Sequence, residues 1–215
     1  MTGPHVQVIA TDAVVAHVAA SAATLVVCAD GGVGVGLRAG RPIDLVVGDL
    51  DSATTADLDA ARAAGARIER FPEAKDETDL ELAMAAAVAA GADTITVHLA
   101  AGGRLDHQLA NLLVLASPRW MSVGIDAWVG HDRVWVVRGR LVVALAVGAA
   151  VAVQAVTGPA TVTTSGLEFA LTGEVLHPAE ARGISNAVVS SPVEVHVDDG
   201  VVLVIGADAQ SAHAT

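Results

Sequence analysis

Aromatic residues and cysteine are scarce in this chain of 215 residues: aromatic side chains make up 2% of it, and Cys28 is its one cysteine. A single thiol excludes a disulfide framework and a cysteine metal site within the chain, and a thiol in an apolar run is typical of a core residue. No run of about 18 apolar residues occurs, and the apolar stretch Leu141–Val153 is too short to span a bilayer. The first residues do not resemble a signal peptide. We therefore expect a cytoplasmic protein.

Basic residues are also few, because 12 Lys and Arg stand against 24 Asp and Glu, which gives a formal net charge of −12. This charge argues against nucleic acid as a partner and against binding to an anionic membrane. A small cationic ligand, or an anionic ligand chelated by a metal ion, suits such a field better. The length allows one large domain or two small ones.

Over residues 1–138, short apolar runs alternate with longer alanine-rich segments. The predicted strands are Val6–Ala10, Leu25–Ala29, Leu45–Gly48, Arg67–Phe71, Thr94–Leu99 and Ser122–Val129. The predicted helices are Asp12–Ala20, Val33–Ala39, Ala53–Ala64, Thr78–Ala90 and Leu105–Ala116. Alternation of strands and helices predicts an α/β domain with a mostly parallel sheet and helices on both faces.

From residue 139 to residue 215 the pattern changes to short β-rich runs separated by turn signals. The predicted strands are Leu141–Leu145, Val151–Val156, Ala160–Thr164, Glu168–Leu171, Val193–Val197 and Val201–Ile205. Helical stretches are absent here, so we expect a second, all-β domain of sandwich or barrel type.

Acidic residues cluster at the ends of the predicted parallel strands. In an open parallel sheet, ligands bind at the carboxyl ends of the strands. Four successive strand ends carry Asp together with Gly, Lys or Arg, in the segments Ala29–Gly32, Gly48–Ser52, Lys75–Asp79 and Gly102–His107. The sequence therefore predicts a binding site at this edge of the sheet.

Asp49 and Asp51 are separated by one residue, so in an extended segment both carboxylates point to the same side. Two carboxylates about 5 Å apart repel by roughly 3 kcal/mol at an effective dielectric constant of about 20. With Asp30 and Asp79 nearby, either a cation balances this repulsion or one acid stays protonated. Oxygen ligands of this kind suit Mg²⁺.

The alternative is that these residues cap helices, with Asp51 or Ser52 beginning the third helix and Asp76 or Thr78 the fourth. Four acidic strand ends are harder to explain by capping alone, so we favour a metal site.

Lys75 and Arg104 precede predicted helices, where free N–H groups and the helix dipole favour phosphate. Gly102 and Gly103 permit a tight turn and a close approach of the backbone to a ligand. The alternative for each basic residue is a solvated surface charge. Together with the acids, they form an arrangement suited to phosphoryl transfer. His107 is a further candidate ligand contact.

Several sequence blocks occur in the order found in thiamine pyrophosphokinases, and the chain resembles that family over nearly its whole length. The blocks are Asp30–Gly32, Gly48–Ser52, Lys75–Ala83, Gly102–Asn111, Thr164–Leu171, Gly183–Asn186 and Gly200–Ile205. The resemblance implies an N-terminal nucleotide-binding domain (1–138), a C-terminal β-sandwich that binds thiamine (139–215), and a homodimer. It also implies Mg²⁺-dependent transfer of diphosphate from ATP to the thiamine hydroxyl.

The resemblance assigns roles to individual residues. The metal ligands would be Asp49, Asp51 and Asp79. The catalytic residues would be Asp51, Asp79, Arg104 and Asp106. The ATP or phosphate contacts would be Asp30, Gly31, Gly32, Lys75, Thr78, Gly103, Arg104 and His107. The thiamine contacts would be Phe169, Ser185 and Asn186.

Two departures from the family pattern accompany this resemblance. Ala10-Thr11-Asp12 follows the first strand, where glycine or asparagine is common in the family, and Phe169 stands where a larger aromatic side chain is common. Phe169 can also be interpreted as a core residue. Two other functions remain possible from the residues: a Mg²⁺-dependent phosphohydrolase or pyrophosphatase, and a non-catalytic nucleotide or thiamine sensor with the same fold.

Overall fold

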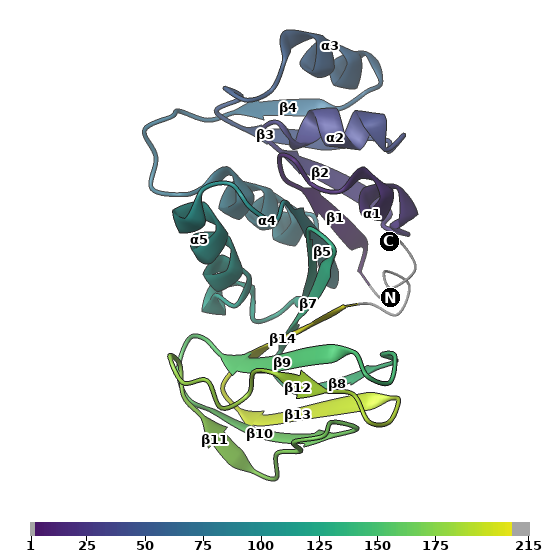
Figure 1. Cartoon of the computed structure of the whole chain (residues 1–215). Coiled ribbons are helices and arrows are strands. Elements are labelled where there is room, and N and C mark those ends of the chain that lie inside the picture. Colours follow the sequence, from purple (N-terminus) through teal and green to yellow (C-terminus); the bar gives the residue numbers. More distant parts are fainter. Residues whose placement is uncertain (1–2, 208–215) are drawn as a thin grey trace. The chain divides into compact units, whose positions relative to one another are not determined.

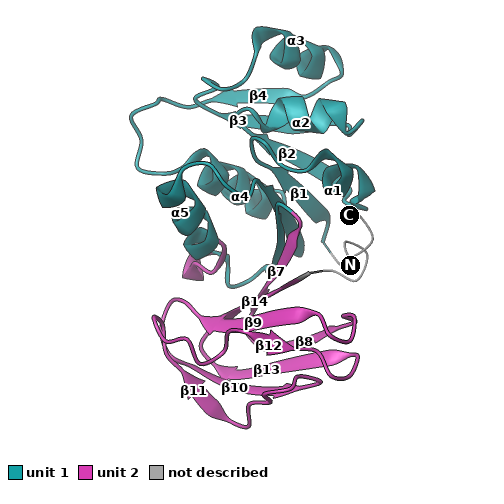
Figure 2. Ribbon diagram, in the orientation of Figure 1, with its two compact units in different colours: residues 1–114, 120–130 teal, residues 115–119, 131–215 magenta. Residues whose placement is uncertain are grey.

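A computed structural model describes residues 3–207 of the chain (Figure 1). The chain divides into two compact units (Figure 2): unit 1 comprises residues 1–114 and 120–130, and unit 2 comprises residues 115–119 and 131–215. Within residues 3–207, every helix is too short or too polar to cross a membrane.

Unit 1 contains a six-stranded sheet in the order β6-β5-β1-β2-β3-β4, and all its strand pairs are parallel. Its strands are β1 (His5–Ile9), β2 (Leu25–Ala29), β3 (Leu45–Gly48), β4 (Arg67–Arg70), β5 (Thr94–Leu99) and β6 (Gly124–Val129). The central strands are almost entirely buried, which explains their continuous runs of Val and Ile.

Helices cover both faces of this sheet, as predicted. They are α1 (Val15–Ala20), α2 (Gly32–Arg38), α3 (Thr55–Ala63), α4 (Asp79–Ala89) and α5 (Leu105–Leu115), followed by the short 3₁₀ helix η1 (Pro118–Trp120). Helix α4 packs on β1, β2 and β3, and α2 packs on the opposite face of β1 and β2 (Figure 1). Because all strands are parallel, the loops after β1 to β5 gather at one edge of the sheet.

Unit 2 is a sandwich of two antiparallel sheets, with the strand orders β12-β9-β14-β7 and β11-β10-β13-β8. Its strands are β7 (Asp132–Val137), β8 (Arg140–Val143), β9 (Ala150–Ala155), β10 (Ala160–Ser165), β11 (Glu174–Leu176), β12 (Asn186–Ala187), β13 (Val193–Asp199) and β14 (Val202–Ala207). Alternate residues of both sheets, such as Val153 and Val195, belong to one buried core.

Three features of the structure differ from the sequence expectations. Helix α1 begins at Val15 rather than at Asp12, because Asp12 has a φ of 60°, which a right-handed helix excludes. Residues 131–138, expected in the first domain, pack in unit 2, and most of them form β7. The predicted strand Glu168–Leu171 is wrong: this stretch forms no strand, and beside it an isolated bridge joins Leu167 to Val188.

Candidate active site

A pocket of about 760 Å³ lies in unit 1, where the loops after its parallel strands meet. Five aspartates and two basic residues are among its lining side chains: Asp30, Asp49, Asp51, Asp79, Asp106, Lys75 and Arg104. Every acidic strand end predicted from the sequence therefore contributes to one pocket, and the excess of carboxylates calls for a cationic or metal-bound ligand.

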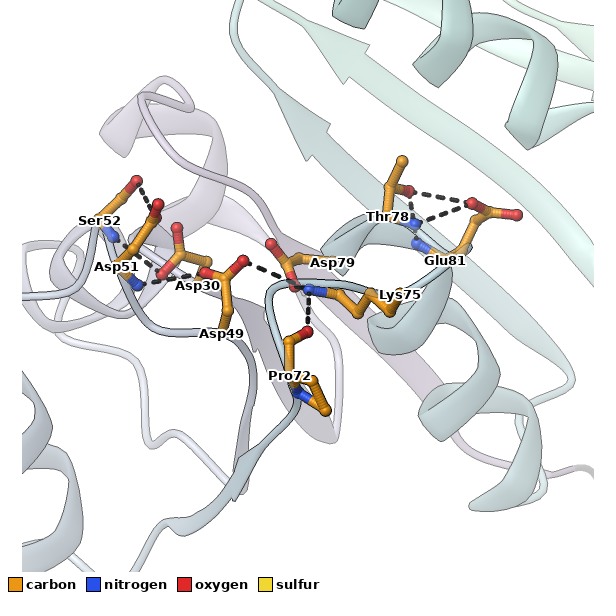
Figure 3. Close-up of polar contacts among 9 residues, drawn as sticks. All are labelled: Asp30, Asp49, Asp51, Ser52, Pro72, Lys75, Thr78, Asp79 and Glu81. Carbon is orange, nitrogen blue, oxygen red and sulfur yellow. Dashed lines mark hydrogen bonds and ion pairs between the residues drawn. The ribbon is translucent and has the colours of Figure 1, made fainter.

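Three of these carboxylates converge (Figure 3). Asp30, Asp49 and Asp79 each offer an oxygen atom that lies within 4.8 Å of the other two. At that separation, two ionised carboxylates repel by roughly 3 kcal/mol at an effective dielectric constant of about 20. A set of carboxylate oxygens without nitrogen or sulfur donors fits Mg²⁺, which prefers hard oxygen ligands.

Unusual backbone conformations bring the three carboxylates together. Asp30 and Leu50 have φ values of 44° and 65°, in the left-handed region that disfavours most side chains. Gly48, at the end of β3, has a φ of 143°, and a Cβ atom there would lie 3.0 Å from Oδ1 of Asp79. Gly48 thus leaves room for the Asp79 carboxylate beside the strand end.

Lys75 lies against two members of this trio. Its Nζ is 3.3 Å from Oδ2 of Asp49 and 3.1 Å from Oδ1 of Asp79, and it donates a hydrogen bond of 3.2 Å to the carbonyl oxygen of Pro72. The lysine side chain is only 12% exposed. Its ammonium group therefore offsets part of the repulsion between the two carboxylates.

The carboxylates respond differently to these surroundings. Burial raises the pKa of Asp30 above its ordinary value, and the charges of Asp51 and Asp79 add to this, although hydrogen bonds from Ser52 and Gly31 oppose it. Burial also acts to raise the pKa of Asp49. There, however, the Asp51 N–H and the Lys75 ammonium outweigh burial, and the pKa is lowered.

The capping alternative applies to one of these loops and not to the other. Thr54, not Asp51 or Ser52, is the N-cap of α3, since its hydroxyl accepts a hydrogen bond from the Asp57 N–H. Thr78 is the N-cap of α4.

The hydroxyl of Thr78 accepts from the Glu81 N–H, and the Glu81 carboxylate accepts from the Thr78 N–H (Figure 3). This capping box fixes the first turn of α4, and Asp79 is the first residue of that helix. A carboxylate at that place is also stabilised by the helix dipole.

Arg104 and Asp106 form an ion pair at the mouth of the pocket. Nη2 of Arg104 is 2.6 Å from Oδ2 of Asp106, and Nε is 3.2 Å from Oδ1. The hydrogen bonds from Arg104 lower the pKa of Asp106 to about 2. Both side chains are largely exposed, so the pair is available to a ligand.

Asp51 lines the pocket but is not in the converging trio, and its carboxylate accepts a hydrogen bond of 3.0 Å from the Ser52 hydroxyl. Asp30, which the resemblance assigns to ATP or phosphate contact, is one of the three converging carboxylates. Gln108 and Asn111 line the pocket too, and neither was predicted as a site residue. Both belong to α5 and are three residues apart, so they lie on one face of the helix, and their spacing of four and seven residues from Arg104 could have identified them.

Comparison with protein families decides the assignment of this pocket. The model of the thiamin pyrophosphokinase catalytic domain matches residues 16–125, and the model of the thiamin pyrophosphokinase vitamin B1 binding domain matches residues 143–202. The chain belongs to the thiamin pyrophosphokinase family. It is therefore an enzyme of the transferase class, and these matches do not favour a phosphohydrolase or a sensor.

Solved thiamin pyrophosphokinases have the same fold. The enzyme from Bacillus subtilis superposes with a TM-score of 0.80 at 20% identity, covering 95% of this chain and 99% of that one. The Geobacillus thermodenitrificans enzyme gives 0.77 at 22% identity, covering 95% and 97%. The yeast enzyme gives 0.75 at 13% identity, covering 99% and 89%. A search of curated protein sequences found no significant match.

The residues expected to contact thiamine lie together in unit 2, inside the match to the vitamin B1 binding domain of thiamin pyrophosphokinases. Oδ1 of Asn186 accepts hydrogen bonds from the N–H groups of Phe169 and Ala187, and Nδ2 donates to the Phe169 carbonyl oxygen at 2.8 Å. The Asn186 side chain thus takes both backbone groups of Phe169, and residues 168–171 form no strand. The Asn186 amide keeps one N–H for a ligand. Phe169 is 58% exposed, so it is not a core residue, and Ser185, which precedes Asn186 in the sequence, is exposed as well.

Proposed function

We propose that this chain transfers diphosphate from Mg²⁺-bound ATP to the hydroxyl group of thiamine. The observation that carries the proposal is the convergence of Asp30, Asp49 and Asp79 within 4.8 Å, in a pocket that also holds Lys75 and Arg104. Carboxylates and cations so arranged suit a metal ion and a polyphosphate together. The nucleotide would bind in the α/β unit 1 and thiamine in the β-sandwich of unit 2.

In this mechanism Asp49, Asp51 and Asp79 would hold Mg²⁺, with Asp30 beside them. The bound ion would supply neutralisation of charge on the phosphate oxygens. Lys75 and Arg104 would contact the same oxygens.

Thr78 and His107, which line the pocket, and three glycines outside its lining would complete the nucleotide contacts. Backbone N–H groups of Gly31, Gly32 and Gly103 would approach the phosphates closely, and Thr78 and His107 would complete these contacts. Because the side chain of Thr78 is engaged in the capping box, its contribution would be to hold the N-terminus of α4 in place.

The chemical step would be an in-line displacement at the β-phosphorus. The thiamine hydroxyl oxygen forms the new bond to this phosphorus, the bond from it to the α–β bridging oxygen breaks, and AMP leaves with that oxygen. The hydroxyl proton passes to a carboxylate, Asp106 or Asp79. Phe169 would stack on the aminopyrimidine ring, and Ser185 and Asn186 would donate or accept hydrogen bonds at its edge.

The test is the release of AMP from ATP with and without thiamine. A thiamine pyrophosphokinase releases AMP only when thiamine is present, whereas a phosphohydrolase hydrolyses the nucleotide without it and a sensor releases none. Asp51→Asn should abolish turnover and leave the fold intact. Near-normal turnover in that variant would show that Asp51 is not a metal ligand.

We also propose that the chain forms a homodimer, supported by exposed leucines on α5. Leu105, Leu109 and Leu113 are spaced by four residues, so they lie along one face of the helix, and all three are exposed. Contiguous exposed apolar surface is typical of an interface. Sedimentation of the wild type and of Leu109→Glu tests this: the variant should become monomeric.

The cytoplasmic location expected from the sequence stays a proposal, which cell fractionation would test.

A further inference from the structure

Lys75 is the one lysine in the sequence. Its ammonium group contacts two of the three converging carboxylates Asp30, Asp49 and Asp79, which are called the acidic trio below. The Nζ contacts Asp49, Asp79 and the Pro72 carbonyl oxygen at 3.1–3.3 Å, so each of its three hydrogen atoms has an acceptor within reach (Figure 3). The ammonium group thus interacts with two of the three carboxylates that would lie around a metal ion in the proposed function.

The ammonium group of Lys75 can move away from these carboxylates. Lys75 belongs to the connection between β4 and α4, and residues 71–78 of this connection form neither helix nor strand. Its contacts are electrostatic and made by the end of a long, flexible side chain. The Asp49 carboxylate accepts a hydrogen bond from the Asp51 N–H, and the backbone of Asp79 belongs to the first turn of α4, so neither depends on the lysine. The two residues therefore keep their places when the ammonium group moves.

We propose that Lys75 is a specificity-determining residue that keeps a free divalent ion out of the acidic trio and admits the ion only as its nucleotide complex. This inference rests on the proposed function. A metal ion alone must displace the ammonium group from Asp49 and Asp79 and leave two cations side by side with no new anion. A metal–nucleotide complex brings phosphate oxygens that take over as partners of Lys75. The displaced charge is then paired again, and the carboxylates are open to the ion.

The alternative is that Lys75 is only a phosphate contact. Removal of the ammonium group would then weaken the binding of nucleotide and leave the affinity for a free ion unchanged. The two accounts therefore differ in what happens to a metal ion when no nucleotide is present, and that can be measured without turnover.

The experiment measures Mn²⁺ binding by electron paramagnetic resonance, with Mn²⁺ alone and with Mn²⁺ plus a non-hydrolysable ATP analogue. The variant is Lys75→Met, which keeps an unbranched side chain and removes the charge. We expect Lys75→Met to bind Mn²⁺ alone at least about tenfold more tightly than the wild type, and the Mn²⁺–nucleotide complex more weakly. Equal or weaker binding of Mn²⁺ alone by the variant would overturn the inference.

Arg62→Met is the matched control, because it removes one positive charge from an exposed ion pair with Asp59 in α3. It should leave both affinities unchanged. If it raises the affinity for Mn²⁺ alone as much as Lys75→Met does, the effect comes from the net charge of the protein and the inference is wrong.

The wild type provides a second measurement that does not depend on a folded variant. Protein labelled with [¹³C]lysine gives one set of side-chain signals, because there is one lysine. The Cε signal should stay in place with Mg²⁺ alone and shift when Mg²⁺ and the ATP analogue are added together. A shift of equal size with Mg²⁺ alone would overturn the inference.

The same data separate this inference from the proposed function. If the wild type does not bind the Mn²⁺–nucleotide complex at all, the proposed function fails and the inference fails with it. If it binds the complex and also binds Mn²⁺ alone as tightly as Lys75→Met does, only the role of Lys75 is wrong.

Discussion

Asp30 in unit 1 and Asn186 in unit 2 are both buried polar residues, each 8% exposed, but their surroundings differ. The amide oxygen of Asn186 accepts two N–H groups, and its nitrogen donates to a carbonyl oxygen. Asp30 has a positive φ and shares its space with two other carboxylates. Burial of Asn186 therefore stabilises a loop, whereas burial of Asp30 creates repulsion that a ligand can relieve.

This comparison predicts that substitutions in the two units affect different quantities. In the pocket of unit 1, removal of a carboxylate should reduce activity and leave the free energy of unfolding unchanged or raised. In unit 2, removal of the amide should lower the free energy of unfolding. The four predictions below test this division, from the largest expected effect to the smallest.

Asp79→Asn should lower the rate of AMP release with thiamine by at least about 10²-fold, because the variant keeps the shape of the side chain but loses a charge that, in the proposed function, would hold the metal ion. Its melting temperature without ligand should change little, because the relief of repulsion from Asp30 and Asp49 is offset by the loss of the ion pair with Lys75 and of the interaction with the helix dipole. Asp59→Asn, on the exposed surface of α3, is the control and should keep full activity. A loss of activity accompanied by a lower melting temperature would mean that Asp79 supports the fold rather than the site.

Asn186→Ala should lower the free energy of unfolding by about 3 kcal/mol, because it leaves the N–H groups of Phe169 and Ala187 and the Phe169 carbonyl oxygen without their partner. Urea unfolding, followed by circular dichroism, measures the change. Ser185→Ala, at the adjacent exposed position, should change it by less than about 0.5 kcal/mol. Equal effects of the two substitutions would remove the basis of the comparison.

Gly48→Ala should lower the free energy of unfolding by about 2 kcal/mol. The alanine must adopt a φ of 143°, and its Cβ atom would lie 3.0 Å from Oδ1 of Asp79. Gly40→Ala is the matched control: its φ is 66°, and no heavy atom lies within 4 Å of the added carbon. Its cost should be about 1 kcal/mol, from the backbone alone. The difference between the two variants reports the contact with Asp79 together with the less favourable φ of 143°, and an absence of any difference would show that neither contributes.

The architecture of unit 1 could be predicted from the sequence because the boundaries between its strands and helices are clearly marked by residue type. Strands β2 and β3 are short runs rich in Val, of which β2 is followed directly by Asp30 and β3 ends at Gly48, and helices α1, α3 and α4 are rich in alanine. Since parallel strands end at the same edge, the gathering of Asp30, Asp49 and Asp79 followed from their order alone. Their separation did not follow, because it depends on positive φ values at Asp30 and Leu50 that the residue types do not require.

Unit 2 was harder to predict, because its short strands carry little periodicity. Strands β11 and β12 have three and two residues, too few for alternation to show. The segment Glu168–Leu171 was predicted as a strand, yet the Asn186 side chain binds the backbone N–H and carbonyl groups of Phe169 in the middle of it. Strand β7 was missed although Gly130, with a φ of 60°, marks the turn before it.

Asp30→Asn should raise the free energy of unfolding at neutral pH by about 0.5–1 kcal/mol while activity falls, a trade of stability for function that is common at active sites. The asparagine keeps an oxygen to accept from the Ser52 N–H and tolerates the positive φ, but it carries no charge toward Asp51 and Asp79.

The effect of Asp30→Asn on the free energy of unfolding should depend on pH. Burial raises the pKa of Asp30 in the folded protein, so the folded state holds this proton more tightly than the unfolded chain does. The stability that comes from the protonated carboxyl is present at low pH. It is lost as the pH rises from the ordinary value of 3.8 through the raised pKa. The advantage of Asp30→Asn over the wild type should therefore be absent below about pH 3.8 and grow to a plateau above the raised pKa, as measured by urea unfolding in EDTA across that range. An advantage that is constant with pH would mean that the gain does not come from the charge of Asp30, and the contrast with Asn186 would then lose its electrostatic basis.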